Sequence, residues 1–226
     1  RNTSPEVKAH LLVAANSLVQ AAAGVLATQT PSPEGPSVER IDLDDTTVHR
    51  FEALTRWQHP TRGLLGPGEF LPAMEGNDAI VELDRLVLDE VCAQIVRWRA
   101  RTTAPVEVTV NVSHRSFWSE GFLDTVRSAL TGHGVSPECV NLELTENTIM
   151  TDPDLARATM AGLRDIGVSL YIDDFGTGHS SLHLLRTFPL DTLKIAGPFV
   201  SELTEIAESA ALMQAIITMA SALGMS

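Results

Sequence analysis

Six polar side chains occur at or near the carboxyl ends of stretches whose sequence predicts β-strands. They belong to five different predicted strands, and all but the lysine offer oxygen atoms: Glu52, Asn111, Glu143, Asp173, Asp174 and Lys194. Carboxylates gathered in one site repel one another unless a cation lies between them. Because oxygen ligands without a cluster of His or Cys favour a hard ion, the pattern predicts a Mg²⁺ or Mn²⁺ site.

The adjacent pair Asp173 and Asp174 could serve two ions about 3.5–4 Å apart, an arrangement used for in-line displacement at phosphorus. Lys194 could then orient the attacking water or neutralise charge developing on phosphate oxygens. Taken alone, each acid is more often a helix cap or a solvated loop residue. Asn111, which is followed by Ser113, could merely cap a turn, and Lys194 could be a surface charge. It is the whole set that favours a site.

Hydrophobic periodicity predicts how these residues are positioned. Strands are expected at 38–43, 47–54, 106–112, 139–144, 168–173 and 191–195, and helices at 68–75, 79–100, 119–132, 152–165, 180–187 and from 202 to about 223. The first two strands should form a hairpin, since they are joined by Asp44 and Asp45. Alternating strands and helices predict parallel βα units. Polar strand ends spread over five strands favour a (β/α)8 barrel over an open sheet, so the fold class is α/β.

The composition narrows the classes of partner. The 226 residues include 16 Lys and Arg against 29 Asp and Glu, which gives a net charge of −13 with histidine neutral. Such a charge argues against binding to long nucleic acid or to an anionic membrane surface. The two cysteines lack the spacing of a metal site or a disulfide framework, which is typical of the cytoplasm.

Residues 1–37 are expected to form an N-terminal helix followed by a linker rich in Pro and Ser. The uncharged stretch at 11–27 is interrupted by polar residues and is shorter than the roughly 20 apolar residues of a membrane-spanning helix. A buried or partner-packing helix is therefore favoured over a membrane anchor. The following domain is expected to occupy residues 38–226.

The motifs around the candidate residues resemble those of the EAL domain, the bacterial phosphodiesterase family acting on cyclic di-GMP. The resemblance covers about residues 38–226, in family order. It rests on EALTRWQHPTRGLL (52–65), PGEFLPAME (67–75), VNVSHRSF (110–117), LELTEN (142–147), YIDDFGTGHSSL (171–182) and LRTFPLDTLKIAGPFV (185–200). It implies a TIM-like barrel with an antiparallel first strand, and hydrolysis of cyclic di-GMP to linear pGpG.

The resemblance also implies residue roles. One Mg²⁺ or Mn²⁺ would be bound by Glu52, Asn111, Glu143 and Asp173, and a second by Asp173 and Asp174, whereas Ca²⁺ would inhibit. Lys194 would position the hydrolytic water. Glu146 would hold the DDFGTG loop, which the family uses to link the metal site to dimerisation, so a homodimer through that region is one expectation. The substrate would meet Arg56 at a phosphate and Leu54 and Pro72 along its groove.

Several departures from the family pattern lower the expected activity. Ala196 replaces an acid close to the metals, Val38-Glu39 replaces a Gln-Pro pair, and His179 replaces a tyrosine. The family continues into an AEGVE segment and a QG segment that follow the last residue here, and six strands are predicted where a closed barrel has eight. The expectation is an EAL domain lacking two βα units that hydrolyses poorly or not at all. The alternatives are a non-catalytic receptor for cyclic di-GMP and a module that only dimerises.

Overall fold

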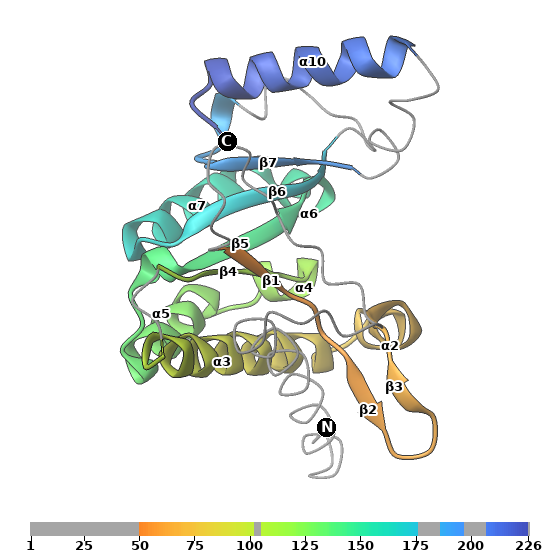
Figure 1. Ribbon diagram of the computed structural model, residues 1–226, viewed down its shortest axis with the longest axis vertical. Helices are drawn as coiled ribbons and strands as arrows, with labels where there is room; N and C mark the ends of the chain where they lie inside the picture. The colour runs from red at the N-terminus through yellow and green to blue at the C-terminus, as the bar shows by residue number, and fades with distance from the viewer. Residues whose placement is uncertain (1–49, 102–104, 176–185, 197–206, 226) are drawn as a thin grey trace. The chain divides into compact units, whose positions relative to one another are not determined.

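The computed structural model describes residues 50–101, 105–175, 186–196 and 207–225, with side chains in the last segment from residue 213 onward (Figure 1). The chain divides into two compact units between Val140 and Asn141. The expected N-terminal helix, the linker, the strand at 38–43 and most of the helix at 180–187 lie outside the described residues. The antiparallel first strand therefore stays a prediction.

The first unit contains two parallel strands, β1 (Arg50–Ala53) and β4 (Glu107–Asn111). Arg50 lies opposite Glu107, and an ion pair of 2.9 Å between Arg50 Nε and Glu107 Oε2 joins the two strands at their amino ends. The carboxyl ends of both strands therefore point the same way, as the sequence predicts for a βα unit.

A short antiparallel hairpin of β2 (Trp57–His59) and β3 (Gly63–Leu65) follows β1. The sequence analysis missed it, because strands of three residues are too short to show an alternating pattern. Gly63 has a φ of 77°, a conformation that glycine adopts without steric penalty, and it begins the second strand of the hairpin.

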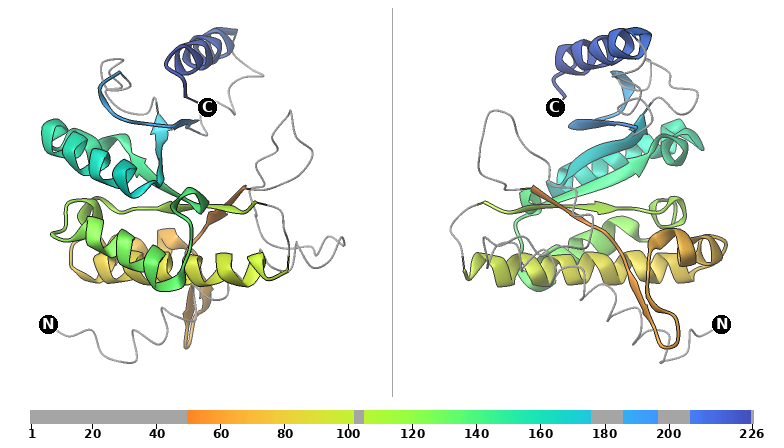
Figure 2. Two further views of the ribbon diagram at one scale, coloured as in Figure 1. Left: turned by 90° about the vertical axis from the view of Figure 1, so that its left-hand side faces the viewer. Right: turned by 45° about the vertical axis from the view of Figure 1, so that its right-hand side comes forward.

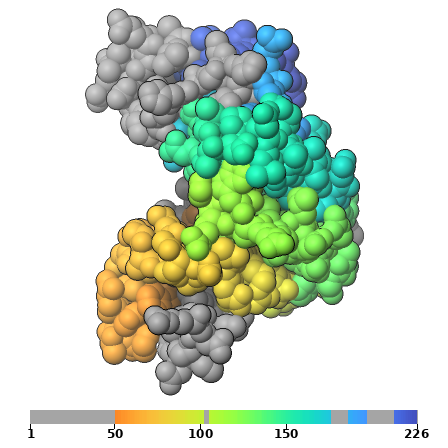
Figure 3. All heavy atoms as spheres, turned by 180° about the vertical axis from the view of Figure 1, so that it is seen from behind, coloured from red at the N-terminus to blue at the C-terminus, as the bar shows by residue number. Residues whose placement is uncertain are grey.

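Helices α2 (Pro67–Met74), α3 (Ala79–Arg99), α4 (His114–Phe117) and α5 (Phe122–His133) complete the first unit. The apolar face of α3 contacts β4 and α5, and Figure 2 shows α3 running alongside β4. The atoms of α3 lie next to those of α4 and α5 when the molecule is seen from behind (Figure 3). Residues that α3 buries almost completely include Leu83, Val91, Cys92 and Ile95.

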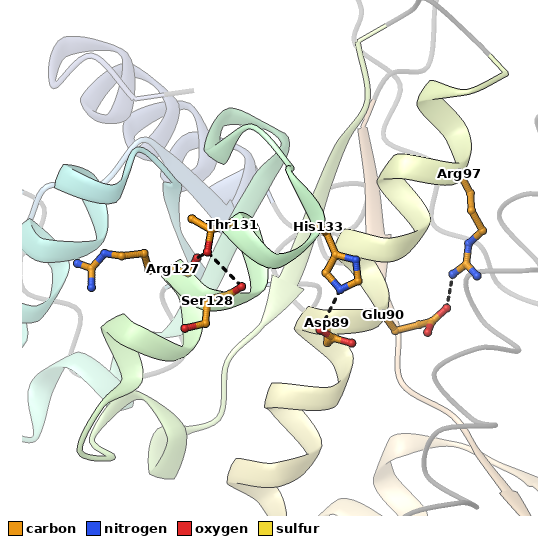
Figure 4. A network of polar contacts seen from close by, with 7 residues as sticks. All are labelled: Asp89, Glu90, Arg97, Arg127, Ser128, Thr131 and His133. Atoms are coloured by element: carbon orange, nitrogen blue, oxygen red, sulfur yellow. Dashed lines mark hydrogen bonds and ion pairs between the residues drawn. The ribbon is translucent and has the colours of Figure 1, made fainter.

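One polar contact links the exposed edges of α3 and α5, and the others in Figure 4 lie within a single helix. His133 Nε2 lies 2.9 Å from Asp89 Oδ1, and Glu90 pairs with Arg97 along α3. The helix expected at 119–132 begins later, at Phe122, because Gly121 has a left-handed φ of 80° that interrupts the helical backbone. The short α4 precedes this interruption.

The second unit holds three parallel strands in the order β5 (Val140–Thr145), β6 (Ser169–Phe175) and β7 (Thr192–Ile195). A 3-10 turn at Pro137–Cys139 precedes β5. Helices α6 (Glu146–Met150) and α7 (Pro153–Ile166) contact β6, and α10 (Ala207–Ala222) is the last helix. Asp152 caps α7 by accepting from Leu155 N at 3.1 Å, and Gly167 ends it with a φ of 103°.

Each unit therefore pairs parallel strands with helices, which confirms the α/β class. The strands expected at 106–112, 139–144, 168–173 and 191–195 are confirmed with small shifts at their ends. Among the described residues, no helix combines the length and hydropathy that crossing a membrane requires.

Candidate functional site

Strand register places three of the predicted site residues on one face of the second unit's sheet. Glu143 of β5 lies opposite Tyr171 of β6, and Tyr171 lies opposite Thr192 of β7. Side chains two positions apart on a strand share a face. Asp173 and Lys194, two positions beyond these partners, therefore project from the same face as Glu143.

Glu143 is the most deeply buried of the predicted ligands. Its side chain has 0% exposure, and its Oε1 lies 2.5 Å from Nζ of Lys194, whose side chain is 35% exposed. A carboxylate removed from water needs a compensating cation, because an uncompensated buried charge is strongly unfavourable. The ammonium group meets this need and crosses the face of β6 to do so. Lys194 is thus an internal ionic partner rather than a surface charge.

The adjacent carboxylates of β6 lie at a distortion of the strand. Asp174 has a φ of 55°, and the β6–β7 register shifts between Ile172 and Phe175. In a regular strand, Asp173 and Asp174 would face opposite sides of the sheet. A residue in the left-handed region interrupts that alternation. Asp173 is half-buried and Asp174 is exposed.

This backbone conformation gives a testable difference between substitutions. Asn tolerates the left-handed region better than Ala does. We therefore expect Asp174→Ala to have a free energy of unfolding about 1 kcal/mol lower than Asp174→Asn in metal-free buffer. Both variants lose the charge, so chemical denaturation of the pair compares them without a difference in net charge.

The same two substitutions at Asp154 provide the control, because Asp154 lies in the first turn of α7 with a side chain that is 92% exposed. There the Ala variant should be no less stable than the Asn variant, since Ala has the higher helix propensity. Equal stability of the two Asp174 variants would contradict the assignment of strain.

The first unit brings together the other two predicted ligands. Glu52 of β1 lies opposite Thr109 of β4, and Asn111 is two positions further along β4, on the same face. Asn111 Nδ2 donates to Glu52 Oε1 at 2.9 Å. Capping of the next helix is done by Ser113, whose Oγ accepts from Ser116 N at 3.2 Å. Asn111 is therefore bound to Glu52, and Ser113 is the turn cap.

The predicted substrate residues also lie in the first unit. Leu54 and Arg56 are half-buried just after β1, and Arg56 Nη1 donates to the Thr55 carbonyl at 3.0 Å. Pro72 is exposed within α2. Glu146 is the first residue of α6 and is 5% exposed. The loop from Gly176 onward is outside the described residues, so the proposed contact of Glu146 with that loop stays a prediction.

The donor chemistry fits a hard divalent ion. Among the described residues, no group of three or more His, Cys, Asp and Glu side chains surrounds a common point. The structure instead forms two pairs, one in each unit: Glu52 with Asn111, and Glu143 with Lys194. Both pairs consist of oxygen ligands or their ionic partner, and Lys194 supplies the cation that the buried Glu143 carboxylate requires in this structure.

Thiol chemistry does not compete with this interpretation. Both cysteines are free and buried. Burial raises the pKa of the Cys92 thiol to about 12, so this thiol stays protonated and is neither a nucleophile nor a metal ligand at neutral pH.

Sequence reasoning missed Asp84 of α3. Ser113 N donates to Asp84 Oδ2 at 2.8 Å, just beyond Asn111. Burial raises the pKa of the Asp84 carboxyl, and hydrogen bonds from Ser113 and Ser116 oppose that rise. The only signal in the sequence is an acid beside the apolar positions Leu83 and Leu86, and helical periodicity alone cannot say what it contacts.

Parallel strands with acidic and amide side chains near their carboxyl ends define an α/β protein of TIM-like type. The EAL domain model matches residues 40–226, so the chain belongs to the EAL domain family. The solved structure of the phosphodiesterase PaMucR in complex with c-di-GMP superposes with a TM-score of 0.76 at 40% identity. The match covers 79% of this chain and 72% of that chain.

Curated relatives agree with this assignment. The bifunctional diguanylate cyclase/cyclic di-GMP phosphodiesterase MucR of Pseudomonas aeruginosa is 42% identical over 168 residues, which are 74% of this chain and 24% of MucR. An uncharacterized protein of Mycobacterium tuberculosis is 41% identical over 181 residues, 80% of this chain and 29% of that protein. The chain thus spans less than a third of the length of these two relatives. The family resemblance drawn from the motifs is confirmed.

Proposed function

We propose that this domain hydrolyses one phosphodiester bond of cyclic di-GMP and releases linear pGpG. The observation that carries the proposal is the Glu143 carboxylate, fully buried on the same sheet face as Asp173 and neutralised by Lys194. Membership of a family that includes named cyclic di-GMP phosphodiesterases supports the choice of substrate.

Mg²⁺ or Mn²⁺ is the proposed cofactor, at a two-ion site. The proposed ligands are carboxylate and amide oxygens: Glu52, Asn111, Glu143, Asp173 and Asp174. The bound ions would lower the pKa of the attacking water and stabilise charge on the phosphate oxygens.

Lys194 would have two partners in this mechanism. In the structure, its ammonium neutralises Glu143 at 2.5 Å. The ammonium is partly exposed, so it could also donate a hydrogen bond to the attacking water or to a phosphate oxygen. Donation to the water would hold its lone pair toward phosphorus.

The first unit would bind the substrate. Arg56 uses one of its five N–H donors on the Thr55 carbonyl, and the guanidinium can bind a phosphate through others. Leu54 and Pro72 would line the groove for the nucleotide, and Glu146 would support the loop after Asp174. A homodimer through that loop and a cytoplasmic location, where Cys92 and Cys139 stay free thiols, complete the proposal.

The direct test is chromatographic detection of pGpG after incubation of the chain with cyclic di-GMP and one divalent ion. We expect product to form slowly with Mn²⁺ or Mg²⁺, because Ala196 replaces an acid of the family pattern, and none to form with Ca²⁺ or EDTA. Asp173→Asn is the matched variant, since it keeps the shape of the side chain and removes its charge, and it should form no product. Product formed equally by the wild type in EDTA would contradict a metal-dependent reaction.

Ala196 favours a second candidate function, binding of cyclic di-GMP without turnover. It follows β7 two residues after Lys194 and is 1% exposed. Its methyl group cannot replace the carboxylate found there in the family. Calorimetric titration with cyclic di-GMP in Ca²⁺ separates the functions: binding, with no pGpG formed after exchange to Mn²⁺, would identify a receptor. Absence of both binding and hydrolysis would leave a module that only associates with protein.

A further inference from the structure

The segment after β4 is hydrogen-bonded to α3, a helix that carries none of the predicted ligands. Asp84 lies in the first half of α3, between Leu83, which is 1% exposed, and the apolar face formed with Val87 and Leu88. Its Oδ2 accepts a hydrogen bond of 2.8 Å from the backbone N–H of Ser113. Only Val112 separates Ser113 from Asn111 along the chain.

The same short segment is fixed on both sides of Ser113. Val112 is 7% exposed and Phe117 is 2% exposed, so apolar burial holds its ends. Ser113 Oγ donates to Ser116 Oγ at 2.9 Å and accepts from Ser116 N at 3.2 Å. The Ser113 N–H points back to α3, and the direction of this one bond sets where the chain leaves β4.

We infer that Asp84 is a positioning residue for Asn111. By fixing the backbone of Ser113, its carboxylate holds the carboxyl end of β4 in the conformation in which Asn111 Nδ2 reaches Glu52 Oε1 at 2.9 Å. The inference rests on the proposed function in one respect, that Asn111 serves as a metal ligand. The positioning itself requires no metal.

A carboxylate suits this task for a chemical reason. The backbone N–H of Ser113 is a donor, and an ionised carboxylate only accepts. Hydrogen bonds to a charged acceptor are shorter and stronger than neutral ones. A second contact joins the same two segments of the chain: Arg115 of α4 pairs at 2.7 Å with Asp78, the residue before α3. Asp78 is 89% exposed, so solvent screens this contact. It offers a matched control.

The test compares Asp84→Ala, Asp84→Asn and the control Asp78→Ala, with folding checked by circular dichroism. The first readout is the side-chain amide resonance of Asn111 in metal-free protein, assigned with Asn111→Ala. We expect Asp84→Ala to shift it toward the position of a free asparagine amide. Asp84→Asn should restore it, because the amide oxygen still accepts from Ser113, and Asp78→Ala should leave it unchanged.

The second readout is the dissociation constant for Mn²⁺, measured by calorimetry. Loss of a group that orients a metal ligand typically weakens binding 10- to 100-fold, and we expect that range for Asp84→Ala, with recovery in Asp84→Asn. If Asp84→Ala unfolds, Asp84→Ser takes its place, since its shorter hydroxyl side chain leaves the Ser113 N–H out of reach.

The two readouts separate the inference from the proposed function. An unchanged Asn111 amide resonance in a folded Asp84→Ala or Asp84→Ser variant would overturn the inference, whatever the metal does. An unchanged Mn²⁺ dissociation constant in that variant, with Asn111→Ala weakened, would also overturn it. The third outcome is that the wild type binds no Mn²⁺ while Asp84→Ala still shifts the Asn111 amide resonance. It would support the positioning by Asp84 and reject the metal-dependent function.

Discussion

Replacing Lys194 with methionine is expected to lower the free energy of unfolding by about 3 kcal/mol in metal-free buffer. The reason is the position of its partner: the Glu143 side chain is fully buried and lies 2.5 Å from the ammonium. Methionine fills much of the same volume but leaves the carboxylate without this cation. For a chain of this size, that loss lowers the melting temperature by roughly 6–12 °C.

The double variant Glu143→Gln with Lys194→Met is the control for this prediction. Gln keeps the shape of Glu143 and carries no charge, so removing the lysine no longer strands a buried anion. Thermal and chemical denaturation should therefore find the double variant more stable than Lys194→Met alone. Saturating Mn²⁺ should raise the melting temperature of Lys194→Met, because binding to the folded state stabilises it. If the destabilisation by Lys194→Met is the same with Glu or Gln at 143, the ionic pairing is not what stabilises the sheet.

This pairing shows how far sequence can predict the site. Strand periodicity located Glu143 and Lys194 near the carboxyl ends of two predicted strands, and both positions are confirmed. Their direct contact could not be predicted, because it depends on the register of β6 between them. Nor could the distortion at Asp174, since Asp is not a residue that marks a left-handed position as glycine does.

Asn111 illustrates a second reason why the sequence does not predict all contacts of the site. From the sequence, its amide could cap a turn or serve a site, and both interpretations use the same local residues. The structure separates them through two contacts that are distant along the chain, Asn111 with Glu52 and Ser113 with Asp84. Local propensity says nothing about partners so far away, which is also why Asp84 was not recognised.

The elements themselves followed the expected pattern wherever the periodic segments were long. Helix α3 was predicted almost to the residue, because its apolar face repeats over many turns. The β2–β3 hairpin and α4 were missed, since each strand or helix has four residues or fewer. Such segments are stabilised by their tertiary surroundings rather than by a pattern of their own.

The largest expected effect on the rate of hydrolysis comes from a substitution in the first unit. We expect Glu52→Gln to reduce the rate of cyclic di-GMP hydrolysis by on the order of 1,000-fold, because a metal ion supplies several kcal/mol of transition-state stabilisation. Gln can still accept the hydrogen bond from Asn111 Nδ2, and Glu52 is only half-buried. Its free energy of unfolding should therefore change by no more than about 0.5 kcal/mol.

Glu107→Gln is the matched substitution on the same pair of strands. Glu107 pairs with Arg50 at the amino ends of β4 and β1, whereas Glu52 and Asn111 occupy the carboxyl-end side. If the chemistry belongs to the carboxyl ends, as it does in barrels of this type, Glu107→Gln should hydrolyse cyclic di-GMP at the wild-type rate. Equal losses of activity in the two variants would show that charge on these strands acts through folding. A loss confined to Glu52→Gln, with stability unchanged, would place Glu52 in the reaction.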